Sequence, residues 1–293
     1  MYHFNTPEEE LAYRIAIERG SADSVTGTIT FTDGSTMAIT DDVILESSLT
    51  ITKQCVDSDS LMFGGVFTDT LKISVLPDTD HADRYLFFGA KIELAYSIKV
   101  GEEEEEGEEE PTPIYATLPL GIFYVADAEK PDSFVGLTAY DSLTLLDKDL
   151  GSTYITGTPW EMFSQISDDT GYPLAFTEQD LTQFVNYDKA AAGSDQNGMK
   201  TYRDIVKLLC QMLGCFACDD RTGQLMLKKF SITPDLTLGN YAERIYPWYK
   251  LVPADYICSY TGISITSQAG VFTKITDNPL VAGIIMVIDD APA

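Results

Sequence analysis

The sequence predicts an α+β protein that is mainly β, with an antiparallel β-barrel domain and a small α/β domain. Between residues 25 and 140, apolar and polar residues alternate, which is typical of half-buried strands. Between residues 158 and 230, apolar residues follow helical spacing and then a hairpin pattern. Turn residues separate the many short strands, which favours an antiparallel barrel or sandwich.

The same patterns divide the chain into four segments. Residues 1–20 form a helical arm and 21–150 a first β-barrel domain. Residues 151–235 form a small α/β domain, and 236–293 form a second β domain that is incomplete where the sequence stops. A chain of 293 residues is long enough for two or three domains with cores of their own.

Capping signals predict the helical arm. Thr6 suits the N-cap, Pro7 suits the first helical position, and Glu9 completes a capping box. Gly20 suits the C-terminal stop. The apolar stripe is thin, which predicts a peripheral helix, and consists of Leu11, Ala12 and Ile15.

The first β domain opens with a hairpin pattern. Alternating residues at 28–31 and 37–39 flank a turn at 33–35. Further strands are expected at 49–52, 71–75, 91–98, 122–125 and 134–140.

An acidic run stands inside this domain at 101–113, with eight glutamates among two glycines and two prolines. Because it lies between two strand patterns, we expect a solvated and disordered tip of one long hairpin. Charge repulsion would keep such a tip extended. Capture of calcium by the glutamates is the alternative.

The α/β domain opens with a helix after Thr158, where Pro159 and Glu161 complete the start signal and Gly171 supplies the stop. Its buried side is expected to carry Trp160, Phe163 and Ile166.

A second helix of this domain follows Thr201, with Asp204 at the reciprocal capping position and Gly214 as the stop. A hairpin with a turn at 220–223 comes next. The expected buried side of the helix comprises Ile205, Leu208, Leu209, Met212 and Leu213.

The last part of the chain again resembles strands. They are expected at 244–249, 255–260, 262–265 and 271–275, with a turn at 277–279. The apolar run at 280–288 is too short for a membrane span of about 20 residues. The first residues lack the pattern of a signal peptide.

The formal net charge of −27 excludes one large class of function. A surface this acidic repels phosphate backbones and argues against sequence-specific binding of DNA or RNA.

Five cysteines, an odd number, predict reduced thiols: Cys55, Cys210, Cys215, Cys218 and Cys258. Cys210, Cys215 and Cys218 have a spacing that zinc sites use, but Cys210 lies on an apolar helix face. We favour free thiols packed as small apolar residues over a metal or redox role.

Other candidate catalytic groups are few. The only histidines are His3 and His81, and we expect His81 to be a plain surface residue. No phosphate loop, zinc-binding helix, nucleophile elbow or dinucleotide fingerprint is present. Paired carboxylates at 41–42, 168–169 and 219–220 fit exposed turns.

Two tryptophans could stack on sugars. Trp160 is expected in the core, whereas the pair Trp248 and Tyr249 is open between core and interface. No catalytic, cofactor-binding or metal-binding residue is therefore assigned, and the chain is expected not to be an enzyme.

Short sequence pieces follow one another in a particular order along the chain. They are IxFxDGS at 29–35, the strand-like segment 51–75, GIFYV at 121–125, LTAYDSL at 137–143, TGY at 170–172, TYRDIV at 201–206, GCFA at 214–217 and DDRTGQL at 219–225. This ordered set resembles the N-terminal hub region of phage and prophage tail proteins, the family of tail-associated lysins and contractile-tail baseplate hubs. The resemblance spans about residues 25–280 and includes a turn at 278–279.

This resemblance implies a baseplate-hub-like fold with two barrel-like domains and small α/β domains in each subunit of a homotrimeric ring. Such a ring joins the tail tube to the tail tip, with other tail proteins as partners and DNA only passing through. It implies a place in the virion tail, assembled in the cytoplasm of the bacterial host. A lytic activity found downstream in many members is not implied for this chain.

Two other classes of function remain alternatives. One is a β-rich adhesin or carbohydrate-binding module, which as an adhesin would need a signal peptide. The other is a carbohydrate-active enzyme, which would need two carboxylates facing each other across a cleft.

Overall fold

Seven antiparallel strands form the largest sheet of the protein, in the order β2-β1-β5-β6-β7-β4-β3. The computed structural model describes residues 6–53, 64–103, 112–130, 133–194, 198–229, 260–267, 270–275 and 284–288. Within those residues β2 and β3 are the edges of the sheet, and no ladder joins them into a closed barrel. The strands are β1 (Asp23–Thr30), β2 (Thr36–Ile39), β3 (Thr50–Thr52), β4 (Thr70–Val75), β5 (Lys91–Glu103), β6 (Thr112–Glu129) and β7 (Val135–Asp141).

The helix α1 (Pro7–Arg19) precedes the sheet and contacts β5 and β6. Thr6 caps it and Gly20 ends it in the left-handed region, as predicted. Ala16 is its buried residue, whereas Leu11 of the expected stripe is 59% exposed. The helix is therefore peripheral, as predicted, but its apolar stripe is not buried within the described residues.

The longest hairpin joins β5 to β6, and its two strands stay paired as far as Glu103 and Thr112. The predicted acidic tip at 101–113 thus begins and ends inside this hairpin, and residues 104–111 lie outside the described part. The strands extend well beyond the predicted 91–98 and 122–125. We attribute the shorter prediction to the glutamates and prolines, which hide the alternation.

The core of the sheet consists of alternate residues from its strands, sealed by a short 3-10 helix, η1 (Arg84–Phe87). Because side chains alternate across a strand, every second residue points into this core. Its most deeply buried large side chains include Ile29, Ile39, Leu71, Ile73, Phe87, Ile92 and Phe123.

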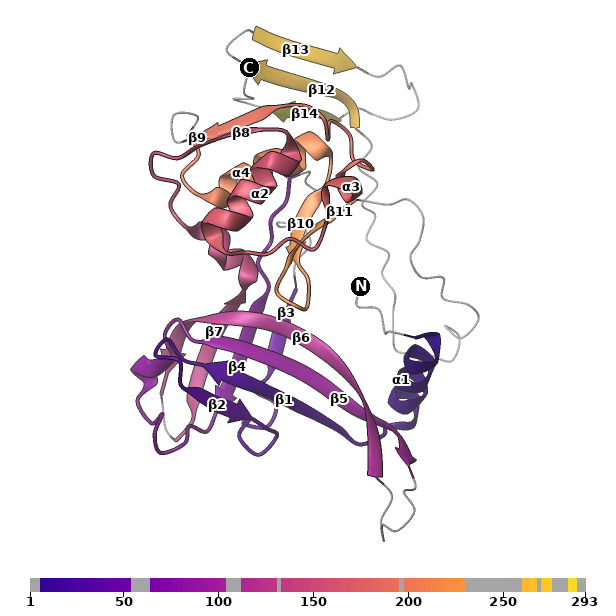
Figure 1. Cartoon of the computed structure of the whole chain (residues 1–293), viewed down its shortest axis with the longest axis vertical. Coiled ribbons are helices and arrows are strands. Elements are labelled where there is room, and N and C mark those ends of the chain that lie inside the picture. Colours follow the sequence, from indigo (N-terminus) through magenta and orange to yellow (C-terminus); the bar gives the residue numbers. More distant parts are fainter. Residues whose placement is uncertain are drawn as a thin grey trace.

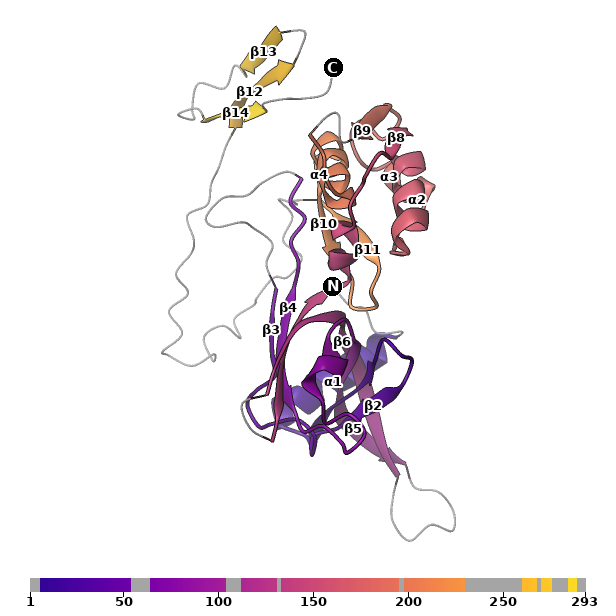
Figure 2. The same ribbon diagram turned by 90° about the vertical axis from the view of Figure 1, so that its left-hand side faces the viewer.

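A second hydrophobic core belongs to the α/β part of the chain (Figures 1 and 2), which lies beyond one end of the sheet along the long axis of the molecule. Two two-stranded sheets and three helices surround this core. The elements are η2 (Ser142–Asp147), β8 (Tyr154–Gly157), α2 (Pro159–Thr170), α3 (Glu178–Leu181), β9 (Ala191–Ser194), α4 (Tyr202–Leu213), β10 (Phe216–Asp219) and β11 (Leu225–Lys228).

Both predicted capping boxes of this part are present. In α2 the Thr158 amide donates to Glu161 Oε2 at 2.8 Å, and in α4 the Thr201 amide donates to Asp204 Oδ2 at 3.1 Å. Gly171 ends α2 in the left-handed region. The caps fix where each helix starts and therefore which residues face the core.

The buried faces agree with the prediction except in small shifts. Phe163 and Ile166 are buried, while Trp160 is only partly buried against the core. In α4 the buried face is rotated about the helix axis relative to the expected one. It comprises Tyr202, Ile205, Val206, Leu209, Cys210 and Leu213, with Leu208 and Met212 at its margin.

The C-terminal strands form a three-stranded sheet: β12 (Tyr260–Ser267) pairs antiparallel with β13 (Gly270–Ile275) and parallel with β14 (Ile284–Ile288). The strands predicted at 262–265 and 271–275 are present. The strand predicted at 244–249, most of that at 255–260, Trp248, Tyr249, Cys55, Cys258 and His3 lie outside the described residues.

The predicted fold class, mainly β with an antiparallel domain and a small α/β domain, is confirmed. The domain predicted as a β-barrel is an open antiparallel sheet within the described residues. The segment limits 1–20, 21–150, 151–235 and 236–293 stay a prediction. By packing, Val66 and Leu143 belong to the second core. No helix in the described part of the chain is long and apolar enough to cross a membrane.

Candidate functional site at the junction of the two cores

Two chain connections link the sheet to the α/β part. The first runs from residue 64, whose amide donates to the Cys215 carbonyl at 2.9 Å, through Val66 to the start of β4 at Thr70. The second runs from the end of β7 at Asp141 into η2, where Leu143 enters the second core. We call residues 66–70 and 140–147, together with Arg203, the junction.

The two connections are hydrogen-bonded to each other. The Asp69 amide donates to Asp141 Oδ2 at 2.8 Å, and the Asp141 amide donates to the Asp69 carbonyl at 3.1 Å. Asp141 Oδ1 also accepts the Leu143 amide at 3.1 Å and so caps η2. One carboxylate therefore holds both connections in register.

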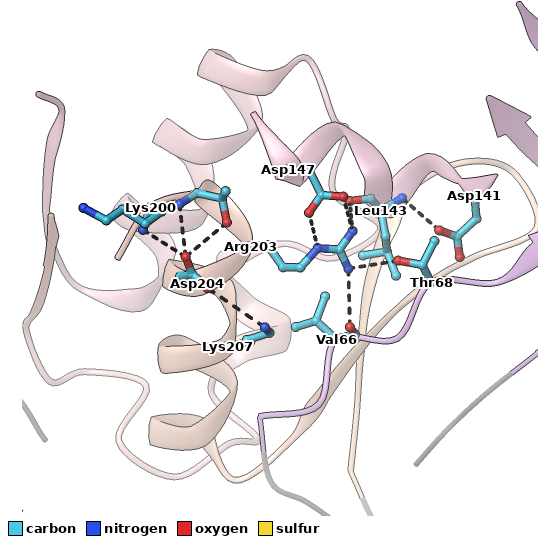
Figure 3. Close-up of polar contacts among 10 residues, drawn as sticks. Val66, Thr68, Asp141, Leu143, Asp147, Lys200, Arg203, Asp204 and Lys207 are labelled. Atoms are coloured by element: carbon cyan, nitrogen blue, oxygen red, sulfur yellow. Dashed lines mark hydrogen bonds and ion pairs between the residues drawn. The ribbon is translucent and has the colours of Figure 1, made fainter. Parts of the chain in front are cut away.

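Arg203 of α4 completes this bracing (Figure 3). Its Nε and Nη2 donate to the two carboxylate oxygens of Asp147 at 2.5 and 2.9 Å. Nη2 also donates to the Leu143 carbonyl at 2.8 Å. On the other connection, Nη1 donates to Thr68 Oγ1 at 2.9 Å and to the Val66 carbonyl at 3.4 Å.

These five contacts match the five N–H donors that a guanidinium carries. They join both connections to α4, whose buried face is part of the second core. Only 12% of the Arg203 side chain is exposed, so little water is available to replace a lost contact. The arrangement makes the junction stiff.

Local structure presents Arg203 in this position. Thr201 and Asp204 cap α4, and Asp204 Oδ2 also accepts the Lys200 amide at 2.9 Å (Figure 3). Desolvation opposes the ionised form of Asp204, but hydrogen bonds from Lys200 and Thr201 outweigh it and lower its pKa. The cap fixes the first turn, and Arg203 is the second residue of that turn.

Buried carboxyl groups lie in the junction and beside it. Asp69 is 8% exposed and pairs with Lys53. Asp219 at the end of β10 is also 8% exposed, and its Oδ1 accepts the hydroxyl of buried Tyr172 at 2.5 Å. The junction and the end of β10 therefore place buried acids in one region. Lysine and arginine side chains neutralise the negative charge of these acids only in part.

Burial changes the acidity of these groups. Desolvation, with the charge of Asp69 nearby, raises the pKa of Asp141 to about 7 against the opposing hydrogen bonds and Arg203. Desolvation, with the charges of Asp141 and Asp220, raises the pKa of Asp219 to about 8. Desolvation and the neighbouring Asp219 also raise the pKa of Tyr172. Tyr172 thus stays a hydrogen-bond donor at neutral pH.

The expectation of exposed turns was wrong for one member of the acidic pairs. Asp219 is buried, because it follows Ala217 by two residues in β10 and shares its inward face. In each of the other pairs, one acid accepts a hydrogen bond from a residue 16 or 33 positions away in the sequence rather than from its own turn. Asp41 accepts the Val25 amide at 2.9 Å, and Asp169 accepts the Tyr202 hydroxyl at 3.1 Å.

The cysteine cluster has the form of free thiols. Cys210 and Cys215 are fully buried and Cys218 is partly buried. A hydrogen bond with Cys215 and desolvation raise the pKa of Cys210, and desolvation raises that of Cys218 to about 11. Among the described residues, no group of three or more His, Cys, Asp or Glu side chains could hold a metal ion.

The prediction that His81 is a plain surface residue was wrong. It is 9% exposed and stacks on Phe31, with the ring centroids 4.2 Å apart. The polar loop around it gave no sign of this, because Phe31 lies 50 residues earlier in the chain.

A shallow hollow of about 290 Å³ lies beside β1. Asp41 and Glu46 are its two carboxylates, and Asp41 already accepts the Val25 amide. One of the two acids is therefore engaged in holding the backbone.

No protein-family model matches the sequence, and no curated protein matches it. Several solved structures have a similar chain path. A 43 kDa tail protein of prophage MuSo2 from Shewanella oneidensis is 11% identical, with a TM-score of 0.44 over 92% of this chain and 71% of that one. A chain of the native gene transfer agent virion is 10% identical, with a TM-score of 0.33 over 48% of each chain.

A third similar structure is a Francisella PdpA-VgrG complex, at 11% identity and a TM-score of 0.42 over 92% of this chain and 44% of that one. The present chain thus spans less than half the length of the gene transfer agent and Francisella chains that it matches. Phage tail proteins, the class that the sequence resemblance named, are among the similar structures. Identities of 10–11% and TM-scores below 0.5 are too low to transfer a fold or a function.

Proposed function

We propose that the chain is a structural, non-enzymatic protein of a phage or prophage tail, acting in the hub that joins the tail tube to the tail tip. In this proposal it forms a homotrimeric ring, contacts other tail proteins, and lets DNA pass without binding it. Its place is the virion tail, assembled in the cytoplasm of the bacterial host.

The observation that supports the proposal is how the ordered sequence pieces fold. The pieces at 29–35 and 121–125 lie in one antiparallel sheet and its β1–β2 turn, and the piece at 137–143 runs from this sheet into η2. The pieces at 170–172, 201–206 and 214–225 lie in the adjoining α/β part. This combination, in this order, is what resemblance to the hub region implies.

The junction supports a mechanical role. A subunit that carries load between a tube and a tip needs its domains to move as one body. Arg203 holds two separate connections with five donors, and Asp141 bonds the connections to each other. Such bracing favours a stiff subunit over one with a hinge.

The charge supports passage of DNA without binding. A lumen lined by carboxylates repels phosphates, whereas Lys and Arg would capture them and release counterions. With 46 acidic and 19 basic residues, the chain has few cations to offer. Fluorescence anisotropy with labelled duplex DNA at low salt should therefore show no binding. Binding that strengthens as salt falls would contradict the acidic lumen.

The deciding experiment is the solution mass of the full chain by light scattering, with negative-stain imaging of the same peak. We expect about 97 kDa, three times the 32.3 kDa of the chain, and rings with a central opening. A species of 32.3 kDa that persists at high concentration would contradict the ring and favour the binding-module alternative.

A further inference from the structure

The β1–β2 turn and the loop between β4 and η1 meet at His81. The imidazole lies nearly parallel to the Phe31 ring, at an interplanar angle of 5°, and Phe31 in turn packs edge-on against Phe87. Ser35 and Asp33 belong to the turn. A buried ring thus connects two segments that the sequence separates by more than 40 residues.

Three side-chain contacts run in a line through this ring. His81 Nδ1 lies 2.7 Å from Asp78 Oδ1, on its own loop. His81 Nε2 lies 3.2 Å from Ser35 Oγ, on the turn. Ser35 Oγ lies 2.7 Å from Asp33 Oδ1. The line is therefore Asp78, His81, Ser35, Asp33, with a carboxylate at each end.

Counting hydrogens shows when all three contacts can be hydrogen bonds. Ionised carboxylates only accept, so both ends of the line need a donor. An imidazolium brings two ring hydrogens and the serine hydroxyl brings one, which makes three hydrogens for three contacts. A neutral imidazole brings one, which leaves two hydrogens for three contacts. Deprotonation of His81 must therefore cost the line one hydrogen bond.

The two carboxylates are suited to stay ionised. Hydrogen bonds from the side chain and backbone of Ser35 lower the pKa of Asp33, aided by the charge of His81. At Asp78, desolvation works in the opposite direction, but hydrogen bonds from His81 outweigh it and lower the pKa. Neither carboxyl supplies the missing hydrogen near neutral pH.

The charged surroundings are limited in the part of the chain that the structure describes. Asp78 faces the ring from its own loop, and Asp33 faces it through Ser35 from the β1–β2 turn. Lys130, just after β6, donates to the Ala82 carbonyl next to His81. Arg84 in η1 bonds the Tyr85 hydroxyl. These cations are engaged beside the line.

The order Ser35, His81, Asp78 also matches that of a nucleophile, a base and its orienting acid. The local backbone does not support hydrolysis, however. The amide of Gly34 donates to the Phe31 carbonyl at 3.0 Å, and that of Ser35 donates to Asp33 at 2.9 Å. The amides of Gly34 and Ser35 are therefore engaged and cannot stabilise an oxyanion beside the hydroxyl.

We propose that Asp33, Ser35, His81 and Asp78 form a proton-dependent latch that fastens the β1–β2 turn to the β4–η1 loop. The latch is complete when the imidazole carries two hydrogens and is one hydrogen bond short when it carries one. Histidine is the side chain whose ordinary pKa lies between about pH 5 and 8, so this is the range over which the latch is tested. The latch would operate whether or not the chain assembles into a ring.

The test is amide hydrogen exchange in the full chain, followed by NMR at about pH 5.5 and about pH 8.5. The amides of Ser35 and His81 report the latch, because they donate to Asp33 and Asp78 at 2.9 Å each. Protection factors, which are corrected for the intrinsic pH dependence of exchange, should fall about fivefold at the higher pH, the effect of about 1 kcal/mol.

The chain offers an internal control in the β10–β11 turn. There the Thr222 amide and hydroxyl donate to Asp220 Oδ1 at 2.8 and 2.9 Å, the same contacts that Ser35 makes with Asp33. No histidine contacts this turn among the described residues. Asp219 lies beside this turn and loses its proton in the same pH range, so Thr222 reports any change that does not pass through His81. Ser35 should therefore lose more protection than Thr222 does.

Two variants complete the design. His81→Phe keeps an aromatic ring on Phe31 but has no ring nitrogen, and Ser35→Ala removes the middle of the line. Both should lose the pH dependence at the turn. Equal protection of Ser35 and His81 at the two pH values in the unmodified chain would overturn the latch. So would a pH dependence that persists in His81→Phe, or one no larger than that of Thr222. If a variant does not fold, comparison of Ser35 with Thr222 in the unmodified chain decides.

Discussion

The guanidinium of Arg203 donates two hydrogen bonds to the carboxylate of Asp147, from Nε to Oδ1 at 2.5 Å and from Nη2 to Oδ2 at 2.9 Å. This fork sets the plane of the guanidinium and aims its remaining donors at the two connections. Lysine has three donors on a point charge and cannot reproduce such a fork. The pair therefore fixes the orientation of the guanidinium in addition to its electrostatic attraction.

Replacing Arg203 should loosen the junction. We expect Arg203→Lys to lower the free energy of unfolding by about 1–3 kcal/mol and Arg203→Ala by about 2–4 kcal/mol, since buried carbonyl groups lose charged donors. Urea denaturation followed by circular dichroism measures the loss. Limited proteolysis between the sheet and the α/β part should also become faster in both variants.

Arg14→Lys is the matched control. Arg14 pairs with Glu10 on α1, and 63% of its side chain is exposed, so water replaces what the substitution removes. We expect a change within about 0.5 kcal/mol. An Arg203→Lys protein as stable as Arg14→Lys would contradict the bracing role of Arg203.

The buried acids near the junction predict a loss of stability at alkaline pH. The pKa values of Asp141 and Asp219 are raised to about 7 and about 8, so the folded state binds these protons more tightly than the unfolded chain does. That stabilisation is complete below the unfolded pKa of about 4 and is lost as pH rises to the folded values. We expect stability to fall by on the order of 2 kcal/mol between about pH 6 and about pH 9.

Asp219→Asn tests the assignment of this effect. The amide oxygen can still accept the Tyr172 hydroxyl, but the side chain no longer titrates. The alkaline loss of stability should therefore shrink in this variant, as measured by urea denaturation across the pH range. Asp220→Asn, in the turn next to it, should keep most of the loss, because desolvation is the largest cause of the raised Asp219 pKa and the charge of Asp220 is a smaller one. An unchanged pH profile in Asp219→Asn would assign the effect to other groups.

The local elements could be predicted from sequence because their signals are local. Thr158 and Glu161 stand three residues apart, and so do Thr201 and Asp204, so the capping boxes are visible in the sequence. Alternation likewise revealed β4 and β7 with limits accurate to one residue. Periodicity reports which side of a strand is apolar, and that was enough for the fold class.

The junction could not be predicted in this way. Arg203 and Asp147 lie 56 residues apart, and Arg203 and Val66 lie 137 apart, so no spacing relates them. Asp219 is a different case. Its alternation with Ala217 in β10 does indicate the inward face, but its carboxylate and its place beside a turn favoured an exposed position. The sequence does not reveal that the hydroxyl of Tyr172 donates a hydrogen bond to the buried carboxyl group of Asp219.

The cysteines of α4 and β10 predict resistance to alkylation. Cys210 and Cys215 are fully buried, and the pKa values of Cys210 and Cys218 are raised, so thiolates are scarce. Under native conditions near neutral pH, iodoacetamide should leave Cys210 and Cys215 unmodified and modify Cys218 slowly, as mapped by mass spectrometry. The same protein in urea supplies the fully modified control. Rapid native modification of Cys210 would contradict the packed-thiol assignment.

A glycine in β1 lies where the neighbouring strand β5 comes close. Gly27 pairs with Ile39 of β2 on one side and Leu94 of β5 on the other. A Cβ at this position would stand 2.2 Å from the Glu93 carbonyl oxygen and 2.8 Å from Leu94 Cδ2. Because the first atom is backbone, Gly27→Ala must push two central strands apart, at about 2–4 kcal/mol.

Gly136→Ala is the matched control, since Gly136 also lies inside a strand of this sheet, β7. Its added Cβ would meet no atom nearer than Ser74 Oγ at 3.7 Å and the Glu129 carbonyl at 3.8 Å, which is ordinary contact. Alanine also restricts the unfolded chain, so we expect a change between zero and a gain of about 1 kcal/mol. Thermal and urea denaturation of the two variants should therefore diverge in opposite directions. Equal stabilities would show that β1 and β5 can separate at Gly27 without cost, contrary to the close approach on which the prediction depends.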